Sequence, residues 1–360
     1  MPPISLNRRS FISALSVSTL STAGCVEIDT DPERTWTPDR DRLRWRRWVD
    51  GRAASSPALH DGTLYIGSFD GALRALDPGD GSVRWTYETN GEIWSSPAVT
   101  DTAVYVGSKD SNLHCLGHDG SEKWQFETEG SIWGGRPAVH RNSVYVGSED
   151  GVVYAIDAGT GTEQWGYQTG DGVFGPPNVT GQTVFAGNRG GSLMALDSST
   201  GDRRWEFTVD DSFDAGLAMA GDIVLAGCKN ETLYALDAEN GRNRWSYGTS
   251  EGINVSPAIA GGTAYFGDWG GNFYAIDVDS GNERWTSDAP IGTINCDPVV
   301  VDGLVYTGDL RGYLRAFDTE TGEEQWSYRT DNAVHSTPVL TDDTIYFGSN
   351  DGYVYAVERP

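Results

Sequence analysis

The sequence predicts an all-β fold, an eight-bladed β-propeller in which each blade has four strands. Three residue types recur with one period, close to forty residues, along most of the 360-residue chain. Each period holds four short runs of β-branched and aromatic residues separated by Gly, Asp, Asn and Thr, which is typical of strands and turns. A repeat of this length with four strands is the size of one propeller blade. No helical periodicity of useful length follows residue 30, so helices are expected to be scarce.

The three recurring markers are a tryptophan, a glycine and a proline. The tryptophans are Trp45, Trp85, Trp124, Trp165, Trp205, Trp245, Trp285 and Trp326. The glycines are Gly67, Gly107, Gly147, Gly187, Gly227, Gly267, Gly308 and Gly348. The prolines are Pro57, Pro97, Pro137, Pro177, Pro257, Pro298 and Pro338, with Leu217 in the remaining position. Three markers that keep one period define eight structural repeats without a linker between them, so residues 43–360 are expected to form one domain.

The two ends of the repeat region are complementary. The region starts on a tryptophan strand, residues 43–48, that has no blade of its own, and it ends on a third strand at 353–357. We expect the N-terminal strand to supply the missing fourth strand of the last blade. This pairing would close the ring and leave no exposed sheet edge.

One stretch, Ala155 to Trp165 (AIDAGTGTEQW), shows the chemistry of the repeat. Asp157 can accept backbone N–H groups in an Asx turn, and Gly161 can supply a positive φ in the hairpin. Trp165 then offers a large ring to bury between neighbouring sheets. Close copies start at Ala75, Ala195, Ala235, Ala275 and Ala316, and Cys115 starts a shortened copy.

This motif resembles the tryptophan-docking repeat of the pyrroloquinoline quinone (PQQ)-like propeller family, over residues 43–360. The resemblance implies an eight-bladed propeller with the eight marker tryptophans docked between blades. Two kinds of relative are relevant: quinoprotein dehydrogenases, and non-enzymatic propellers such as the lipoprotein of the bacterial barrel-assembly machinery. The repeat itself does not choose between them, because a fold does not fix a function.

The charge balance excludes one class of partner. The chain has 52 acidic residues against 26 basic ones, a formal net charge of −26, and all but three of the basic residues are arginine. Nucleic acid is not expected as a partner, since phosphate contacts need positive patches. A solubilising acidic surface is one interpretation. Adaptation to high salt, which would make the chain haloarchaeal-like, is the one we favour, because salt screens the repulsion between carboxylates.

The N-terminus carries a targeting signal, residues 1–24. Residues 7–12 (NRRSFI) resemble a twin-arginine export signal, and the apolar stretch after them is too short to span a bilayer. Residues 22–25 (TAGC) resemble a lipobox, although Thr22 stands where the pattern prefers Leu. We therefore expect lipidation at Cys25 and attachment to the outer face of the cytoplasmic membrane, with plain signal cleavage as the alternative. The acidic residues 25–42 would form a tether.

Two positions vary from blade to blade while the residues around them repeat. Both fall on loops that the alternation of strand directions places on one side of the ring. The first, which we call the entry slot, precedes each proline strand: Ala54, Trp94, Trp133, Phe174, Asp214, Asn254, Asn295 and His335. The second, which we call the loop slot, lies two residues after each repeat glycine: Phe69, Lys109, Glu149, Arg189, Lys229, Trp269, Leu310 and Asn350. Packing residues should follow the repeat, so the slots are the candidate site.

The two slots supply aromatic and cationic side chains together. The aromatic rings are Trp94, Trp133, Phe174 and Trp269, and the cations are Lys109, Arg189 and Lys229. This combination indicates a surface for an anionic or planar partner. Ordinary loop variation with solvated charges is the alternative. The partners expected are other exported or membrane proteins, or a small ligand, bound by a monomer.

No catalytic residue, resident metal or cofactor is expected. The resemblance to quinoprotein dehydrogenases implies PQQ, calcium and adjacent cysteines beside the quinone. In this chain Cys115, Cys228 and Cys296 lie in different repeats, and Cys296 is followed by Asp297. Asp214, Asn254, Asn295 and Asp297 could supply oxygen ligands for calcium, which keeps a PQQ-dependent dehydrogenase of alcohols or sugars as the alternative. A non-catalytic binding or assembly scaffold is the function we predict.

Overall fold

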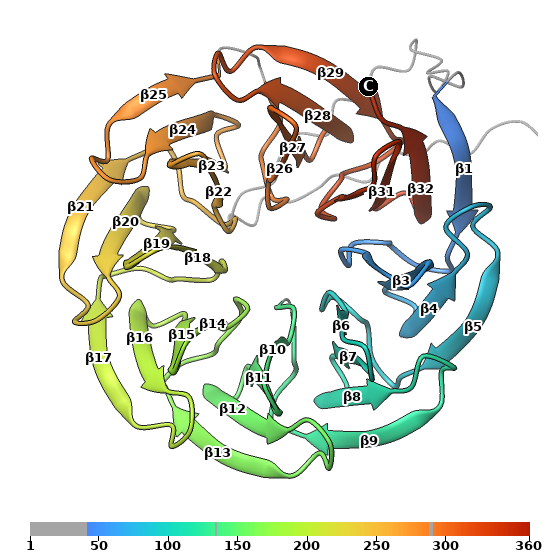
Figure 1. Ribbon diagram of the computed structural model, residues 1–360, viewed down its shortest axis with the longest axis horizontal. Coiled ribbons are helices and arrows are strands. Elements are labelled where there is room, and N and C mark those ends of the chain that lie inside the picture. Colours follow the sequence, from blue (N-terminus) through green and yellow to red (C-terminus); the bar gives the residue numbers. More distant parts are fainter. Residues whose placement is uncertain (1–41, 134, 288–290) are drawn as a thin grey trace, which may run out of the picture. The chain divides into compact units, whose positions relative to one another are not determined.

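The computed structural model describes residues 42–133, 135–287 and 291–360. These residues form eight four-stranded antiparallel sheets, which are the blades of a ring (Figure 1). In seven blades the strands follow one another in chain order from the centre of the ring outwards, and in the last blade β1 takes the outermost place, so the predicted eight-bladed propeller is confirmed. In the described part of the chain there is no helix that could cross a membrane. The export signal, Cys25 and nearly all of the tether lie outside the described residues.

The innermost strands face the centre of the ring. They are β2 (Ala58–His60), β6 (Ala98–Val99), β10 (Ala138–His140), β14 (Asn178–Thr180), β18 (Leu217–Ala220), β22 (Ala258–Ala260), β26 (Val299–Val301) and β30 (Val339–Leu340). Seven of them begin just after the marker proline, which has no N–H to donate to a ladder. The exception, β18, begins one position earlier because Leu217 stands in the proline position and pairs with Ala226.

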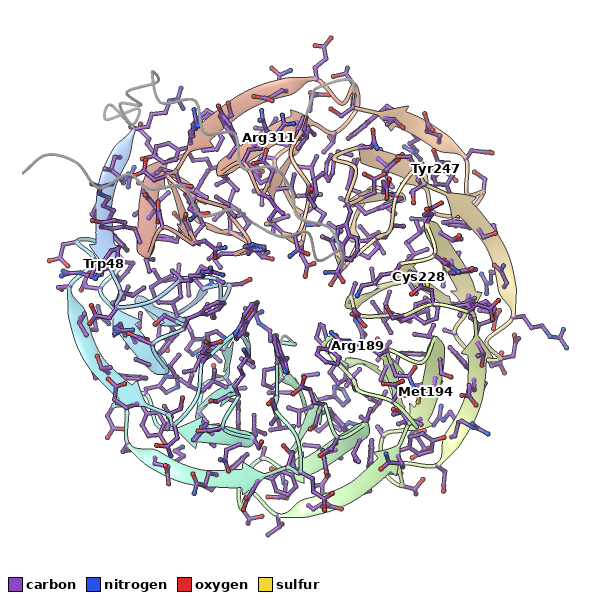
Figure 2. The ribbon with its side chains drawn as sticks, turned by 180° about the vertical axis from the view of Figure 1, so that it is seen from behind. Trp48, Arg189, Met194, Cys228, Tyr247 and Arg311 are labelled. Carbon is purple, nitrogen blue, oxygen red and sulfur yellow. The ribbon has the colours of Figure 1, made fainter. Side chains whose placement is uncertain are left out.

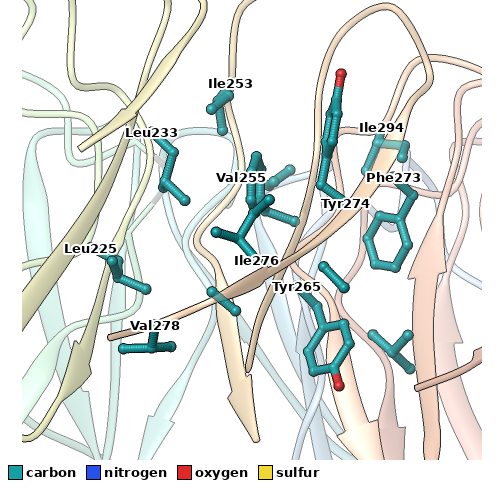
Figure 3. Close-up of a cluster of buried hydrophobic side chains, with 14 of the residues drawn as sticks. Leu225, Leu233, Ile253, Val255, Tyr265, Phe273, Tyr274, Ile276, Val278 and Ile294 are labelled. Atoms are coloured by element: carbon teal, nitrogen blue, oxygen red, sulfur yellow. The ribbon is translucent and has the colours of Figure 1, made fainter. Parts of the chain in front are cut away.

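The second and third strands carry most of the buried apolar side chains. The second strands are β3 (Thr63–Gly67), β7 (Val104–Gly107), β11 (Ser143–Gly147), β15 (Thr183–Gly187), β19 (Ile223–Cys228), β23 (Thr263–Gly267), β27 (Leu304–Gly308) and β31 (Thr344–Gly348). The third strands are β4 (Ala72–Leu76), β8 (Asn112–Leu116), β12 (Val152–Asp157), β16 (Ser192–Asp197), β20 (Thr232–Asp237), β24 (Phe273–Asp277), β28 (Tyr313–Asp318) and β32 (Tyr353–Glu358). Because both faces of these sheets pack on neighbouring blades, the core lies between blades (Figure 3).

The outermost strands carry the marker tryptophans. They are β5 (Val83–Glu88), β9 (Glu122–Glu127), β13 (Glu163–Gln168), β17 (Arg203–Thr208), β21 (Asn243–Gly248), β25 (Glu283–Thr286), β29 (Glu324–Arg329) and, in the last blade, β1 (Leu43–Trp48). The last sheet has the order β1-β32-β31-β30, and Trp48 pairs with Tyr353. The N-terminal strand therefore closes the ring, as predicted.

Seven of the eight marker tryptophans dock in one way. Each indole N–H donates to a backbone carbonyl in the hairpin of the next blade, at 2.8 to 3.1 Å. The indole also covers the hairpin glycine: a Cβ at Gly201, whose φ is +77°, would lie 2.8 Å from Cδ2 of Trp165. Trp326 is the exception, and its indole nitrogen is buried without a partner among the described residues. The next blade is closed by β1, so it has no hairpin there to accept the bond.

Candidate site at the mouth of the central channel

A cavity of about 730 Å³ lies in the central channel and is lined by residues from all eight blades. Every entry-slot residue lines it: Ala54, Trp94, Trp133, Phe174, Asp214, Asn254, Asn295 and His335. From the loop slot, Arg189 and Lys229 line it as well. Figure 2 shows Arg189 towards the centre of the ring, whereas Trp48 and Tyr247 lie at its periphery. The two slots thus meet at one end of the channel, which we call the mouth.

A repeated contact holds each entry-slot residue in place. The residue before it is apolar and buried, and it fills the hollow left by a repeat glycine. A Cβ on Gly107, for example, would lie 2.2 Å from Cγ2 of Ile132, the residue before Trp133. A backbone bond then ties the loop slot to the entry segment, as when Lys109 N donates to Glu92 O at 3.0 Å. The backbone is therefore the same in every blade, while the side chain at the slot is free to differ.

Four aromatic rings form an arc along one half of the mouth. Phe69 stacks on Trp94, with ring centroids 4.1 Å apart. The ring centroids of Trp94 and Trp133 are 5.1 Å apart, and those of Trp133 and Phe174 are 5.8 Å apart. We call Phe69, Trp94, Trp133 and Phe174 the aromatic arc. Its rings come from four consecutive blades, so it presents one continuous apolar wall.

Cations lie against the aromatic arc. The Lys109 ammonium is 4.0 Å from the ring centroid of Trp133 and 5.0 Å from that of Trp94. The Arg189 guanidinium lies 3.6 Å from the Phe174 centroid. Glu92 anchors Lys109 at 2.8 Å, and this bond together with one from the Trp94 indole lowers the pKa of the Glu92 carboxyl. The ring faces thus carry positive charge in a strongly acidic chain.

A compact ion cluster follows the arc. Asp214 is mostly buried, and its Oδ2 lies 2.5 Å from the Lys229 ammonium and 3.4 Å from Nε of Arg189. Its Oδ1 is buried without a hydrogen-bond partner in the described chain. Trp269 stands apart: no ring of the described residues packs on it, it is 40% exposed, and its contact is with Lys229 at 5.3 Å.

The other half of the mouth is polar. Asn254 donates to Asn295 at 2.9 Å, and Asn295 donates to Nδ1 of His335 at 2.9 Å. Burial lowers the pKa of His335 to about 4, and the nearby Arg52 charge adds to this effect. Asp297 accepts from both the backbone N–H and the hydroxyl of Ser256. Its burial raises the pKa of the carboxyl, and the two bonds from Ser256 oppose this.

The structure brings most of the predicted site residues to the mouth of the channel. There they form separate groups: the aromatic arc, the ion cluster and the polar half. Trp94, Trp133 and Phe174 join with Phe69, while Trp269 does not reach the arc. Several lining residues were not predicted, and Arg136 carries a charge among them. Arg136 lies immediately before Pro137 and lines the channel. The signal for it was available, because most blades place Ser, Thr, Pro or Gly there and only the third places a cation.

The donors at the mouth do not fit a calcium-held quinone. Calcium needs six to eight oxygen ligands, yet Asp297 is occupied by Ser256, and Asp214 is paired with cations. The described residues contain no group of three or more His, Cys, Asp or Glu placed to hold a metal. The thiol of Cys296 is buried and donates to Ser336 O at 3.3 Å, with its pKa raised to about 12 by burial. The adjacent cysteines that the quinoprotein resemblance implies are absent from the sequence.

Solved structures share this architecture. The computationally designed Ika8 protein aligns with a TM-score of 0.78 and 18% identity over 88% of this chain and 100% of its own. BamB from Moraxella catarrhalis aligns with a TM-score of 0.77 and 18% identity, over 87% of this chain and 98% of its own. The quinohemoprotein alcohol dehydrogenase ADHIIG from Pseudomonas putida HK5 aligns with a TM-score of 0.75 and 16% identity, over 88% of this chain and 76% of its own. At such identities these likenesses show the fold alone.

Sequence comparison identifies the family. No curated protein matches the chain. A family profile described as the outer membrane protein assembly factor BamB matches residues 34–97, 92–211 and 149–360. Together these matches cover the whole repeat region, residues 43–360, so the chain belongs to the BamB family of PQQ-like repeat propellers.

Proposed function

We propose that the chain is an exported, membrane-anchored propeller that acts as a non-catalytic binding or assembly scaffold for another exported or membrane protein. The observation that carries this proposal is the aromatic arc with its cations. In a chain of charge −26, Lys109 and Arg189 lie directly on half-buried rings at the mouth. Aromatic rings and arginine are enriched at protein interfaces. The family description as an assembly factor agrees with this role.

The chemistry of the arc indicates what the partner presents. Cations over ring faces attract carboxylates, and flat rings take apolar or planar groups. An acidic protein segment with aromatic side chains would satisfy both. The mouth is also the part of the described body where the repeat breaks down, whereas the outer ring is occupied by docking contacts.

The test is crosslinking in membranes followed by recovery of the protein with its partners. The variant Trp133→Ala with Lys109→Ala removes the centre of the arc. A matched control, Trp48→Ala with Lys123→Ala, removes one exposed tryptophan and one exposed lysine away from the channel. We expect recovery of the partner to fall about tenfold or more for the arc variant, as for an interface hot spot, and to be unchanged for the control.

Equal recovery from both variants at equal thermal stability would show that the arc is not the contact surface. Reconstitution with PQQ and calcium tests the alternative function. Stoichiometric quinone binding with dye reduction by alcohols or sugars would replace the scaffold proposal with a dehydrogenase.

Anchoring is tested separately at Cys25. If a lipid on this cysteine holds the protein at the outer face of the membrane, Cys25→Ser should move it from the membrane fraction to the medium. Retention of the variant in washed membranes would argue against the anchor and leave the binding surface unaffected.

A further inference from the structure

The ion cluster of Asp214, Arg189 and Lys229 carries more positive than negative charge. One carboxylate oxygen, Oδ2 of Asp214, lies 2.5 Å from the Lys229 ammonium and 3.4 Å from Nε of Arg189, so both cations share a single counter-ion. In the other ion pairs formed between described residues, each lysine or arginine has at least one carboxylate to itself. Arg244 and Arg315 have two each. The excess of cations therefore distinguishes this cluster from the other described ion pairs.

The carboxylate that holds the two cations is itself buried. The Asp214 side chain is only 8% exposed, and the residue lines the cavity together with Arg189 and Lys229. Its other oxygen, Oδ1, is enclosed and has no hydrogen-bond partner among the described residues. Because a buried carboxylate needs a counter-charge, Asp214 fixes the positions of both cations. Neither of its oxygens is left for a ligand, so the cations are the groups of the cluster that can bind one.

Both cations keep open donors at the mouth of the channel. The Arg189 guanidinium lies 3.6 Å from the Phe174 ring centroid, its side chain is 50% exposed, and it donates no hydrogen bond to a described residue. The Lys229 ammonium donates to Asp214 and lies 5.3 Å from the Trp269 ring centroid. Figure 2 shows Arg189 towards the centre of the ring. Since a guanidinium has five N–H donors and an ammonium has three, most of the donors are open to a ligand.

The charges of the cluster favour an anionic ligand. Two like charges that lie within 3.4 Å of the same oxygen repel each other. Water can accept hydrogen bonds from both cations, but it brings no negative charge to the pair. A bound anion would supply the second negative charge that the two cations lack. In a chain of charge −26, a local excess of positive charge also directs an anionic group to this one place.

We infer that Arg189 and Lys229, held by Asp214, form a binding site at the mouth for an oxyanion group, a carboxylate or a phosphate. An arginine binds either group through two parallel N–H bonds, and a lysine adds a point charge. The cavity of about 730 Å³ leaves room for the molecule that carries the group. The inference rests on the proposed function, since Arg189 also lies against the aromatic arc, and it names the group that this part of the mouth takes.

The test titrates the full chain with inorganic phosphate and with succinate as separate probes, by calorimetry at constant ionic strength. We expect one saturable site for one or both probes. In Lys229→Gln the remaining cation is balanced by Asp214, so the affinity should fall about tenfold or more, and Arg189→Gln should lower it to a similar extent. Arg203→Gln is the matched control, because it removes the same charge from an exposed arginine of β17 that is paired with Glu206. It should bind as the wild type does.

Thermal unfolding gives a second readout. A saturating probe should raise the melting temperature of the wild type and of Arg203→Gln, and it should leave that of Lys229→Gln nearly unchanged. Phosphate binding alone would assign the site to a phosphorylated ligand, and succinate binding alone to a carboxylate group. Absence of saturable binding of either probe, or undiminished affinity in Lys229→Gln or in Arg189→Gln, would overturn the site.

The site and the scaffold role can fail separately. If neither probe binds but Trp133→Ala with Lys109→Ala still loses its partner, the oxyanion site is wrong and the scaffold role stands. If probe binding is saturable and weakens in Lys229→Gln, while the arc variant and its control recover the partner equally, the oxyanion site stands and the scaffold role is wrong.

Discussion

At the outer ring seven tryptophans make the same bond to the next blade, whereas around the channel the entry slot ranges from Ala54 through Trp133 to Asp214. Seven of the eight outer contacts are satisfied in the same way, and Trp326 is the exception. Within the described chain, the channel holds the buried indole N–H of Trp133 and the buried Oδ1 of Asp214, and neither has a hydrogen-bond partner. Stability that is spread over many equal junctions leaves the channel residues free to differ. Side chains that differ from blade to blade are therefore expected where a ligand or partner acts, and repeated ones where the ring is held together.

The largest effect should come from removing the closing strand. A chain that begins at Val49 lacks β1 and exposes the edge of β32 along the positions that paired with Leu43 to Trp48. Exposed edges promote aggregation, and the ring loses one sheet contact on each side. We expect loss of a cooperative transition or a much lower melting temperature, measured by calorimetry. Unchanged melting would break the view that the ring needs closure.

The next effect tests the docking hairpin. Gly201→Ala places a Cβ against the Trp165 indole and also forces an alanine to a φ of +77°. The matched control is Gly221→Ala, which has a φ of +61° but nothing within 4 Å of the new Cβ. We expect Gly201→Ala to lower the free energy of unfolding by about 3 kcal/mol, and the control by about 1 kcal/mol. Urea unfolding measures both, and equal losses would mean that the indole contact contributes nothing.

A pH-dependent effect should belong to the channel. Because burial holds the pKa of folded His335 at about 4 against an ordinary value of 6.5, the unfolded chain binds the proton first. The free energy of unfolding should therefore fall as the pH drops from 6.5 towards 4. This residue should account for a loss of about 2 kcal/mol by pH 5. His335→Gln should lose that part of the slope in urea titrations. Parallel curves for the two proteins would contradict a buried neutral imidazole.

The smallest effect sharpens the comparison within the outer ring. Trp205 and Trp326 are buried alike, but only Trp205 donates its indole N–H, to Ala238 O at 3.0 Å. Replacing either by Phe removes similar apolar area. We expect Trp205→Phe to lower the free energy of unfolding by about 1 kcal/mol more than Trp326→Phe does. The difference is the net contribution of one hydrogen bond, because the substitution at Trp205 also leaves the Ala238 carbonyl unsatisfied. Equal costs would show that the seven bonds add little to docking.

Much of the architecture was predictable because the repeat determines it. The period of about forty residues predicted eight blades of four strands. The unmatched strands at residues 43–48 and 353–357 predicted how the ring closes. The free, buried state of Cys115 and the positive φ of Gly161 also agree with their positions in the repeat. These features depend on backbone pairing and on burial, both of which a recurring pattern reports.

The candidate site was predictable only as a location. Both slots do lie at one end of the channel, but their side-chain contacts depend on rotamers in irregular entry segments. Trp269 was grouped with the other rings and instead lies beside Lys229, while Phe69 joined the arc. Arg136 was missed although the position before the marker proline also varies from blade to blade in the sequence.

The closure of the ring also sets an order in time. β1 is among the first segments of the body to be synthesised, and its partner β32 follows after about 300 residues of further chain. At about 5–20 residues per second the first strand waits roughly 15–60 s for its sheet. During that interval Trp45 and Trp48 have no sheet to cover them. Arg44, Arg46 and Arg47 alternate with them, and charges in such positions oppose pairing with other chains. The strand made first is thus kept soluble until the last strand exists, and the ring is completed only then.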